Sequence, residues 1–351
     1  MSQHHHHQRA DHDHPHDHAD PHDSIWRHRL GHLLGAGSHD HGDRIGNHLE
    51  ASADGLRAVA ISLAGLGATA VLQLLVVVAS GSVALLADTI HNLSDALTAL
   101  PLGLAFLLSR RRPTRRYIYG YGRAEDLAGI FIVAMITLSA TITAWQAIER
   151  LLDPRDIHRA VWVAIAGLIG FIGNEAVAGY RIRVGRRIGS ASLVADGLHA
   201  RADGLTSLAV LGAAIGSMAG WQLADPIIGL VISLAILNVL RVAARDIYRR
   251  LMDAVDPDLV DQIDAQLNAA PGIRAVERTR VRWIGHQLHV DADVTLDAHL
   301  DLVQAHHLLE EARHQLLHHI PRLADALLHA SPTNQHGDPH AITRHHFTHH
   351  P

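Results

Sequence analysis

Two segments of the chain carry a histidine followed four residues later by an aspartate: His91 with Asp95, and His199 with Asp203. On a helix this spacing places both side chains on one face, one turn apart, so that both can reach a single ion. Residues 81–100 and 189–208 match at ten of twenty positions, including every acidic residue and both histidines. A repeat that keeps such residues suggests two halves that build one site.

Two such helices facing each other supply two imidazole nitrogens and two carboxylates, which is enough for a closed tetrahedral metal site. Tetrahedral coordination by nitrogen and oxygen favours Zn²⁺, whereas Mg²⁺ and Ca²⁺ prefer six or more oxygen ligands. Asp88 and Asp196 lie one turn earlier on about the same face, and we expect them to support the ligands or to pack between helices. The alternative is that both histidines are buried polar residues that only form hydrogen bonds across helices.

The elements that must position these residues are long and apolar. Hydrophobic residues make up 48% of the 351 residues and aromatic residues only 4%, a composition typical of membrane helices. A membrane span needs about 20 apolar residues, and six stretches qualify: 57–79, 82–108, 126–148, 160–181, 191–216 and 225–245. The second and fifth carry the repeated motif, and charged groups at membrane depth should face the bundle interior. We therefore expect a transmembrane domain of six helices over residues 51–250.

Arginines set the expected orientation, since the chain contains no lysine. The connection after the second span holds six arginines and the one after the fourth holds Arg181, Arg183, Arg186 and Arg187, whereas residues 80–81 and 217–224 have no basic residue. By the positive-inside rule, both termini and both arginine-rich connections lie in the cytoplasm. The polar first fifty residues show no cleavable signal. We expect a multi-pass protein of a bacterial cytoplasmic (inner) membrane.

Histidine is concentrated at the two ends of the chain: 14 of the 32 histidines lie in residues 1–50 and 15 in residues 286–350. We interpret residues 1–50 and 332–351 as disordered tails that capture metal loosely, with a solvating tail as the alternative. The absence of cysteine excludes disulfides and thiolate metal sites. The formal charge of -5 argues against a nucleic-acid partner. The chain has no nucleophile elbow, Walker loop or dinucleotide fingerprint, which argues against an enzyme.

Residues 251–331 read as a separate α+β domain. The pattern predicts a helix at 258–270, strands at 274–283 and 287–296, a helix at 299–319 and a strand at 323–330. Residues 288–294 alternate apolar and polar, as in a strand with one buried face. An α-β-β-α-β order fits a small ferredoxin-like or metallochaperone-like sandwich. The expected fold class is thus an α-helical membrane protein with a C-terminal cytoplasmic α+β domain.

Charge balance suggests a transport mechanism. Two ionised aspartates neutralise a bound Zn²⁺, and when the metal leaves they remain as an uncompensated double charge inside the membrane. Histidine has a reference pKa of about 6.5 and can take up the replacing protons at physiological pH. Because metal and protons compete for the same atoms, we expect antiport of Zn²⁺ outward against H⁺ inward.

With these motifs in view, the chain resembles the cation diffusion facilitator family of divalent-metal exporters. The resemblance covers about residues 57–331, through the six spans, the repeated Ala-Asp-x-x-His-x-x-x-Asp motif and the region after Pro257. It implies a transport site at His91, Asp95, His199 and Asp203. It also implies a homodimer that associates through the cytoplasmic domain. Members with His and Asp on both helices mostly carry Zn²⁺.

The resemblance implies three further features. Family members bind a regulatory zinc at the dimer interface through histidines that resemble His289, His306 and His329, but Ser331 stands where some members have Asp. Arg123 matches a basic residue that pairs with an acidic one below the sixth span, here Asp253, and such a pair would interlock two subunits. In some bacterial members the loop after the second span holds another zinc site, whereas this chain has Tyr117 and Tyr121 there.

The leading hypothesis is therefore a homodimeric Zn²⁺/H⁺ antiporter that works by alternating access. One alternative keeps the class and changes the ion to Co²⁺, Ni²⁺, Cd²⁺, Fe²⁺ or Mn²⁺. Another is a membrane protein that buffers or senses zinc with its histidine-rich tails and transports nothing. Deletion of residues 1–50 would distinguish the antiporter from the buffer. The antiporter should keep much of its flux without them, whereas the buffer should lose its activity.

Overall fold

The computed structural model describes residues 44–80, 89, 97–152, 159–221 and 223–333. Its helical part contains α2 (Arg44–Ser80), α4 (Ala99–Ser109), α5 (Arg123–Leu152), α6 (Ala160–Ile188), α7 (Ala191–Met218) and α8 (Ala224–Leu251). Five of the six predicted spans coincide with α2, α5, α6, α7 and α8. Most of the second predicted span, with Asp88, His91 and Asp95, lies outside the described residues, and α4 covers its last part. Of the predicted tails, residues 1–43 and 334–351 lie outside them, whereas residues 44–50 form the first turns of α2 and Pro332 ends β3.

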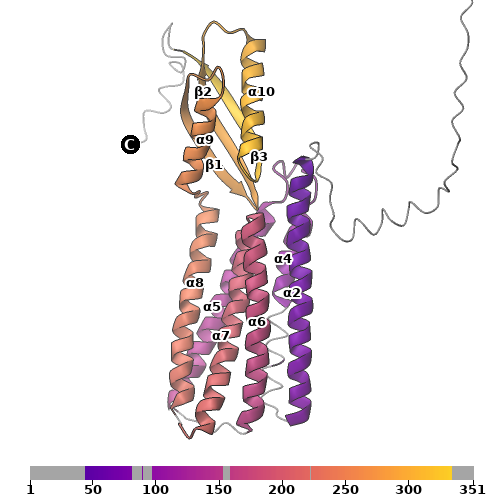
Figure 1. The fold of residues 1–351 in the computed structure, drawn as a ribbon, viewed down its shortest axis with the longest axis vertical. Coiled ribbons are helices and arrows are strands. Elements are labelled where there is room, and N and C mark those ends of the chain that lie inside the picture. The colour runs from indigo at the N-terminus through magenta and orange to yellow at the C-terminus, as the bar shows by residue number, and fades with distance from the viewer. Residues whose placement is uncertain (1–43, 81–88, 90–96, 153–158, 222, 334–351) are drawn as a thin grey trace, which may run out of the picture. The chain divides into compact units, whose positions relative to one another are not determined.

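Four of the described helices are long and apolar enough to cross a membrane: Glu50–Ser80 within α2, and α5, α6 and α8. Helix α7 has the same length as α8, 28 residues. Its first half contains Asp196, Arg201 and Asp203, and the two aspartates are buried. Burial in protein rather than hydropathy therefore places α7 within the helical domain, where it packs against α5, α6 and α8 (Figure 1).

Helices α6 and α7 form a tight hairpin. Helix α6 continues to Ile188, so that Arg181, Arg183 and Arg186 are helical residues and not part of a loop as the sequence suggested. Only Gly189 and Ser190 connect the two helices. Gly189 adopts φ of 78°, a left-handed conformation that glycine takes without strain, and the Ser190 hydroxyl accepts the Leu193 amide to begin α7.

Glycines let the backbones of these two helices approach each other. A Cβ atom on Gly197 of α7 would lie 3.0 Å from the backbone nitrogen of Ile182 and 3.1 Å from the carbonyl oxygen of Ala178. A Cβ atom on Gly167 of α6 would lie 3.0 Å from the Ser207 carbonyl oxygen. Small residues in such positions are typical of helices that pack closely in membranes. Helix α7 is therefore held at a defined distance from α6.

The C-terminal domain contains α9 (Pro257–Ala269), β1 (Ala275–Ile284), β2 (Gln287–Leu296), α10 (Leu302–His319) and β3 (Leu323–Pro332). The sheet order is β1-β2-β3, with β1 and β2 antiparallel and β2 and β3 parallel. Every second residue of β2, from Leu288 to Leu296, is buried against Ile263 and Leu267 of α9 and Leu316 of α10. This confirms the predicted α+β domain and places His289 on the opposite face of the sheet.

Candidate functional site

The described half of the predicted metal site lies on α7. His199 is 1% exposed and Asp203 is 5% exposed, and the imidazole Nδ1 lies 3.8 Å from a carboxylate oxygen of Asp203. The helix brings the two residues together as their spacing predicts. His91 and Asp95, the other two predicted ligands, lie outside the described residues, as does Asp88. Within the described ranges, no three His, Asp or Glu side chains gather as a metal site.

Asp196, one turn before His199, forms a buried ion pair with Arg181. The Arg181 Nη1 lies 3.0 Å from the Asp196 carboxylate, and both side chains are at most 1% exposed. A buried carboxylate needs such a partner because removing a charge from water costs several kcal/mol. Asp196 was expected to support the metal ligands or to pack between helices. It contacts α6 through Arg181, a partner that was not predicted.

Arg181 was not predicted to lie between helices, because the sequence pattern counted it with the arginine-rich connection after the fourth span. A periodic signal in the sequence could have found it. Buried residues of α6 recur every three or four positions along one stripe, namely Gly167, Gly170, Asn174, Ala178, Arg181, Gly185 and Ile188. A charged residue within a stripe of small residues faces the neighbouring helix rather than the cytoplasm.

A second ion pair joins α6 and α7 on another face. Arg201 donates from Nε and Nη2 to the two carboxylate oxygens of Glu175, at 3.1 and 2.7 Å. Arg201 lies two residues after His199, which turns its side chain to about the opposite side of α7. Both side chains of the pair are about 40% exposed. The two arginines thus fix α6 against α7 on either side of the residues that the motif assigns to metal.

Buried polar contacts also link the helices to the C-terminal domain. His286, in the turn between β1 and β2, places Nδ1 2.9 Å from a carboxylate oxygen of Glu125 at the start of α5. Its Nε2 lies 3.5 Å from the Ser52 hydroxyl of α2. These three residues are at most 3% exposed. Nothing in the sequence pattern predicted this contact, since its members lie 161 and 234 residues apart.

Arg123 and Asp253 lie together, as the resemblance implied. The Arg123 Nη2 donates to the Asp253 carboxylate at 3.0 Å within one chain, and Nη1 reaches Asp126 at 3.3 Å. The side chains of Arg123 and Asp253 are 45% and 47% exposed, so the pair itself stabilises the chain by at most about 1 kcal/mol. An interlock between two subunits stays a prediction.

The three histidines of the predicted regulatory site, His289, His306 and His329, do not meet within one chain. His289 of β2 is opposite Asp325, whereas His329 of β3 is opposite Asp293, four residues further along. Four residues of strand span about 13 Å, too far for one ion. Burial lowers the pKa of His289, and Asp325 partly offsets this effect. His306 is exposed on α10. A zinc site shared between two copies, as the resemblance implied, stays a prediction.

Family models match nearly all of the described chain. Residues 59–252 match the cation efflux transmembrane domain, and residues 255–333 match the cytoplasmic domain of cation efflux proteins.

Several curated proteins are similar to this chain. A probable cation efflux system protein of Mycobacterium tuberculosis is 59% identical over 300 residues, which cover 86% of this chain and 90% of that protein. The zinc transporter ZitB of Escherichia coli is 30% identical over 250 residues, 68% of this chain and 79% of that protein. The manganese efflux system protein MneP of Bacillus subtilis is 24% identical, over 72% of this chain and 87% of that protein.

Proposed function

Because the chain belongs to the cation efflux family, whose members carry divalent metal ions across membranes, we propose that it exports Zn²⁺ in exchange for protons. The observation that carries the choice of Zn²⁺ is the buried pair of His199 and Asp203. Imidazole nitrogen suits Zn²⁺ better than it suits Mg²⁺, Ca²⁺ or Mn²⁺. In this proposal the duplicated His91 and Asp95 complete a tetrahedral site.

The charges around α7 support proton exchange at this pair. Arg181 neutralises Asp196 and Arg201 neutralises Glu175, so neither carboxylate needs a metal ion. The charge of the proposed transport site then depends on His199 and Asp203 and on the duplicated residues His91 and Asp95. Departure of Zn²⁺ leaves negative charge in a buried site, which protons can neutralise. One pH unit across the membrane supplies about 1.4 kcal/mol per proton, enough for roughly a tenfold metal gradient.

The arrangement in the cell follows from the same proposal. The chain works as a homodimer in a bacterial inner membrane, with both termini and the C-terminal domain in the cytoplasm. The arginines that end α6 and α8 lie on the cytoplasmic side by the positive-inside rule. The pair of Arg123 and Asp253 then lies near the membrane surface, where the resemblance places an interlock between subunits.

Flux into vesicles tests the proposal. The full chain, reconstituted into proteoliposomes with an entrapped zinc indicator, should accumulate Zn²⁺ faster when the vesicle interior is more acidic than the medium, because protons then leave as Zn²⁺ enters. Asp203→Asn should abolish the flux, while Asp261→Asn, an exposed carboxylate of α9, should leave it unchanged. Zinc flux that ignores the pH gradient would contradict proton coupling.

A panel of metals distinguishes the alternatives. MneP is named for manganese efflux, so Mn²⁺ belongs in the panel together with Co²⁺, Ni²⁺, Cd²⁺ and Fe²⁺. If Zn²⁺ is the substrate, His199→Asp should reduce zinc flux and raise the relative flux of Mn²⁺, because an oxygen donor replaces a nitrogen donor. A protein that binds zinc in solution but gives no flux of any metal would be a buffer rather than a transporter.

A further inference from the structure

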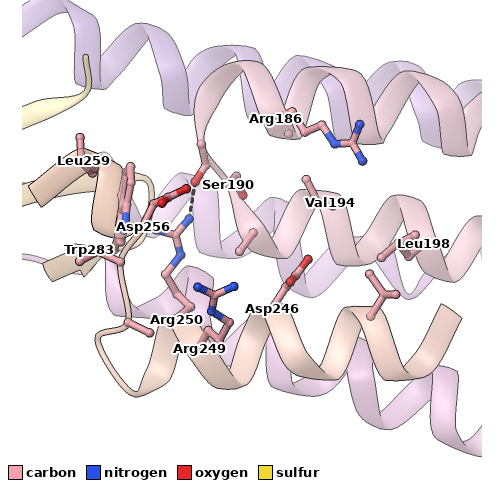
Figure 2. Close-up of a pocket in the computed structure, with 16 residues that line it drawn as sticks. Arg186, Ser190, Val194, Leu198, Asp246, Arg249, Arg250, Asp256, Leu259 and Trp283 are labelled. Carbon is pink, nitrogen blue, oxygen red and sulfur yellow. Dashed lines mark hydrogen bonds between the residues drawn. The ribbon is translucent and has the colours of Figure 1, made fainter. Parts of the chain in front are cut away.

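A cavity of about 400 Å³ lies at the arginine-rich end of the helical domain, where α7 begins and α8 ends (Figure 2). The start of α9 and Trp283 of β1 complete its wall. The α7 motif residues His199 and Asp203 do not line this cavity, and neither do the members of the ion pairs described above. The transport mechanism therefore assigns no role to this cavity.

Three arginines line the cavity: Arg186 at the end of α6, and Arg249 and Arg250 at the end of α8. Arg250 is fixed, because its Nη2 donates to the Gly189 carbonyl oxygen at 2.6 Å and its guanidinium lies 4.3 Å from the centre of the Trp283 ring. The first turn of α7 adds the positive end of a helix dipole.

Arg186 and Arg249 are exposed, and among the described residues neither has an ion-pair partner. Two acidic residues line the same cavity. The Asp256 carboxylate accepts the Asp258 amide and caps α9, while Asp246 lies one turn before Arg249 on α8. The cavity therefore presents a net positive charge with two guanidinium groups available to an anion. A site of this charge repels divalent cations, so it is not a binding site for the transported metal ion.

The opposite end of the cavity is apolar. Val194 and Leu198 of α7 and Val242 of α8 form it, and Val242 belongs to a helix long and apolar enough to cross a membrane. From Val242 to Arg249 is seven residues of α8, or about 10 Å along the helix axis. The cavity thus changes from apolar to cationic over the distance that separates acyl chains from lipid phosphates.

We propose that this cavity binds the phosphate group of an anionic phospholipid of the cytoplasmic leaflet. The phosphate lies against Arg249, with Arg186 on the opposite wall of the cavity (Figure 2), and an acyl chain lies along Val242 and Leu198. Guanidinium groups match phosphate oxygens with paired donors, and basic pockets between membrane helices on the cytoplasmic side are sites of this kind. The lipid contacts α6, α7 and α8 at the point where the C-terminal domain joins them.

Fluorescence quenching tests this proposal, because Trp283 reports on the cavity itself. The full chain keeps Trp283 as its single tryptophan, with the other four replaced by Phe, and is reconstituted into phosphatidylcholine vesicles. Phosphatidylglycerol or phosphatidylcholine with brominated chains is then added at equal mole fractions. We expect brominated phosphatidylglycerol to quench Trp283 more strongly. Equal quenching by the two lipids would overturn the proposal.

Substitutions distinguish the cavity from the general charge of the surface. Arg249→Gln and Arg186→Gln, on different helices, should each reduce the preference for phosphatidylglycerol about fivefold. Arg245→Gln removes the same charge one turn earlier on α8, outside the cavity, and should leave the preference unchanged. An equal loss in Arg245→Gln would reduce the effect to nonspecific attraction and refute the site.

Inorganic phosphate separates the two sources of the anion. Phosphate added to the vesicles should leave the preference for phosphatidylglycerol intact, because it lacks the acyl chain that fills the apolar end. Loss of the preference in phosphate would mean that the cavity binds free phosphate, and the lipid assignment would be wrong.

Discussion

Replacing His286 with Ala should detach the turn between β1 and β2 from the helical domain. The His286 side chain is 4% exposed and that of Glu125 is 1% exposed, with 2.9 Å between Nδ1 and Oε2. In the described part of the chain the second carboxylate oxygen of Glu125 has no hydrogen-bond partner. His286→Ala would therefore leave the carboxylate buried without its main partner.

The size of the effect follows from these contacts. A hydrogen bond to a charged group contributes about 1.5 to 3 kcal/mol, and orphaning a buried charge costs about 3 to 5 kcal/mol. We expect about 3 kcal/mol, because a water molecule can enter the space left by the imidazole and hydrate part of the carboxylate. This free energy corresponds to about a 150-fold increase in the population of the locally open state.

Hydrogen exchange measures this local opening. Amide protection around Gly285 should fall about 150-fold in His286→Ala, while His314→Ala, an exposed histidine of α10, should leave it unchanged. Glu125→Gln in the His286→Ala background should restore most of the protection, because the orphaned charge is gone. Protection that changes by less than threefold in His286→Ala, or a double variant no better than the single one, would refute this reasoning.

Three further predictions concern α6, α7 and β2. Arg181→Met should lower the free energy of unfolding by about 3 to 5 kcal/mol, because it strands the Asp196 carboxylate, and adding Asp196→Leu should recover most of the loss in detergent-solubilised unfolding. Gly197→Ala should destabilise the protein by about 1 to 3 kcal/mol, since its new Cβ would press on the α6 backbone. Gly179→Ala should instead stabilise it slightly, since no atom of another element lies within 4 Å of that Cβ. In metal-free protein, stability of the C-terminal domain should fall as the pH drops below about 6.5, because the folded state lowers the pKa of His289 and binds fewer protons than the unfolded state.

Each of these predictions has a result that contradicts it. Additive losses in Arg181→Met and Asp196→Leu would show that the two side chains do not depend on each other. Equal effects of alanine at positions 197 and 179 would mean that the close approach of the helices has no energetic weight. For His289, the pH dependence should flatten in His289→Gln, and an unchanged slope would assign it to other groups.

Periodicity in the sequence was sufficient to place most elements. The alternation over residues 288–294 identified β2, whose observed bounds are Gln287–Leu296. Pro257 and Pro271 with Gly272 bracket the first helix of the C-terminal domain, observed as Pro257–Ala269. These predictions succeeded because helices and strands bury one face at a fixed period, which leaves a local trace. The pairing of His199 with Asp203 also succeeded, since a single helical turn joins them.

Contacts between distant segments needed the tertiary structure. Arg181 was assigned to a loop because an arginine at the end of an apolar run usually marks the membrane surface, and only the packing of α6 on α7 shows that it pairs with Asp196. His286 and Glu125 are 161 residues apart, and no local pattern relates them. The sequence by itself determined the helices, the strands and the proximity of His199 and Asp203 within one helix. The tertiary structure decided which buried charges neutralise each other, because that depends on which helix faces lie together.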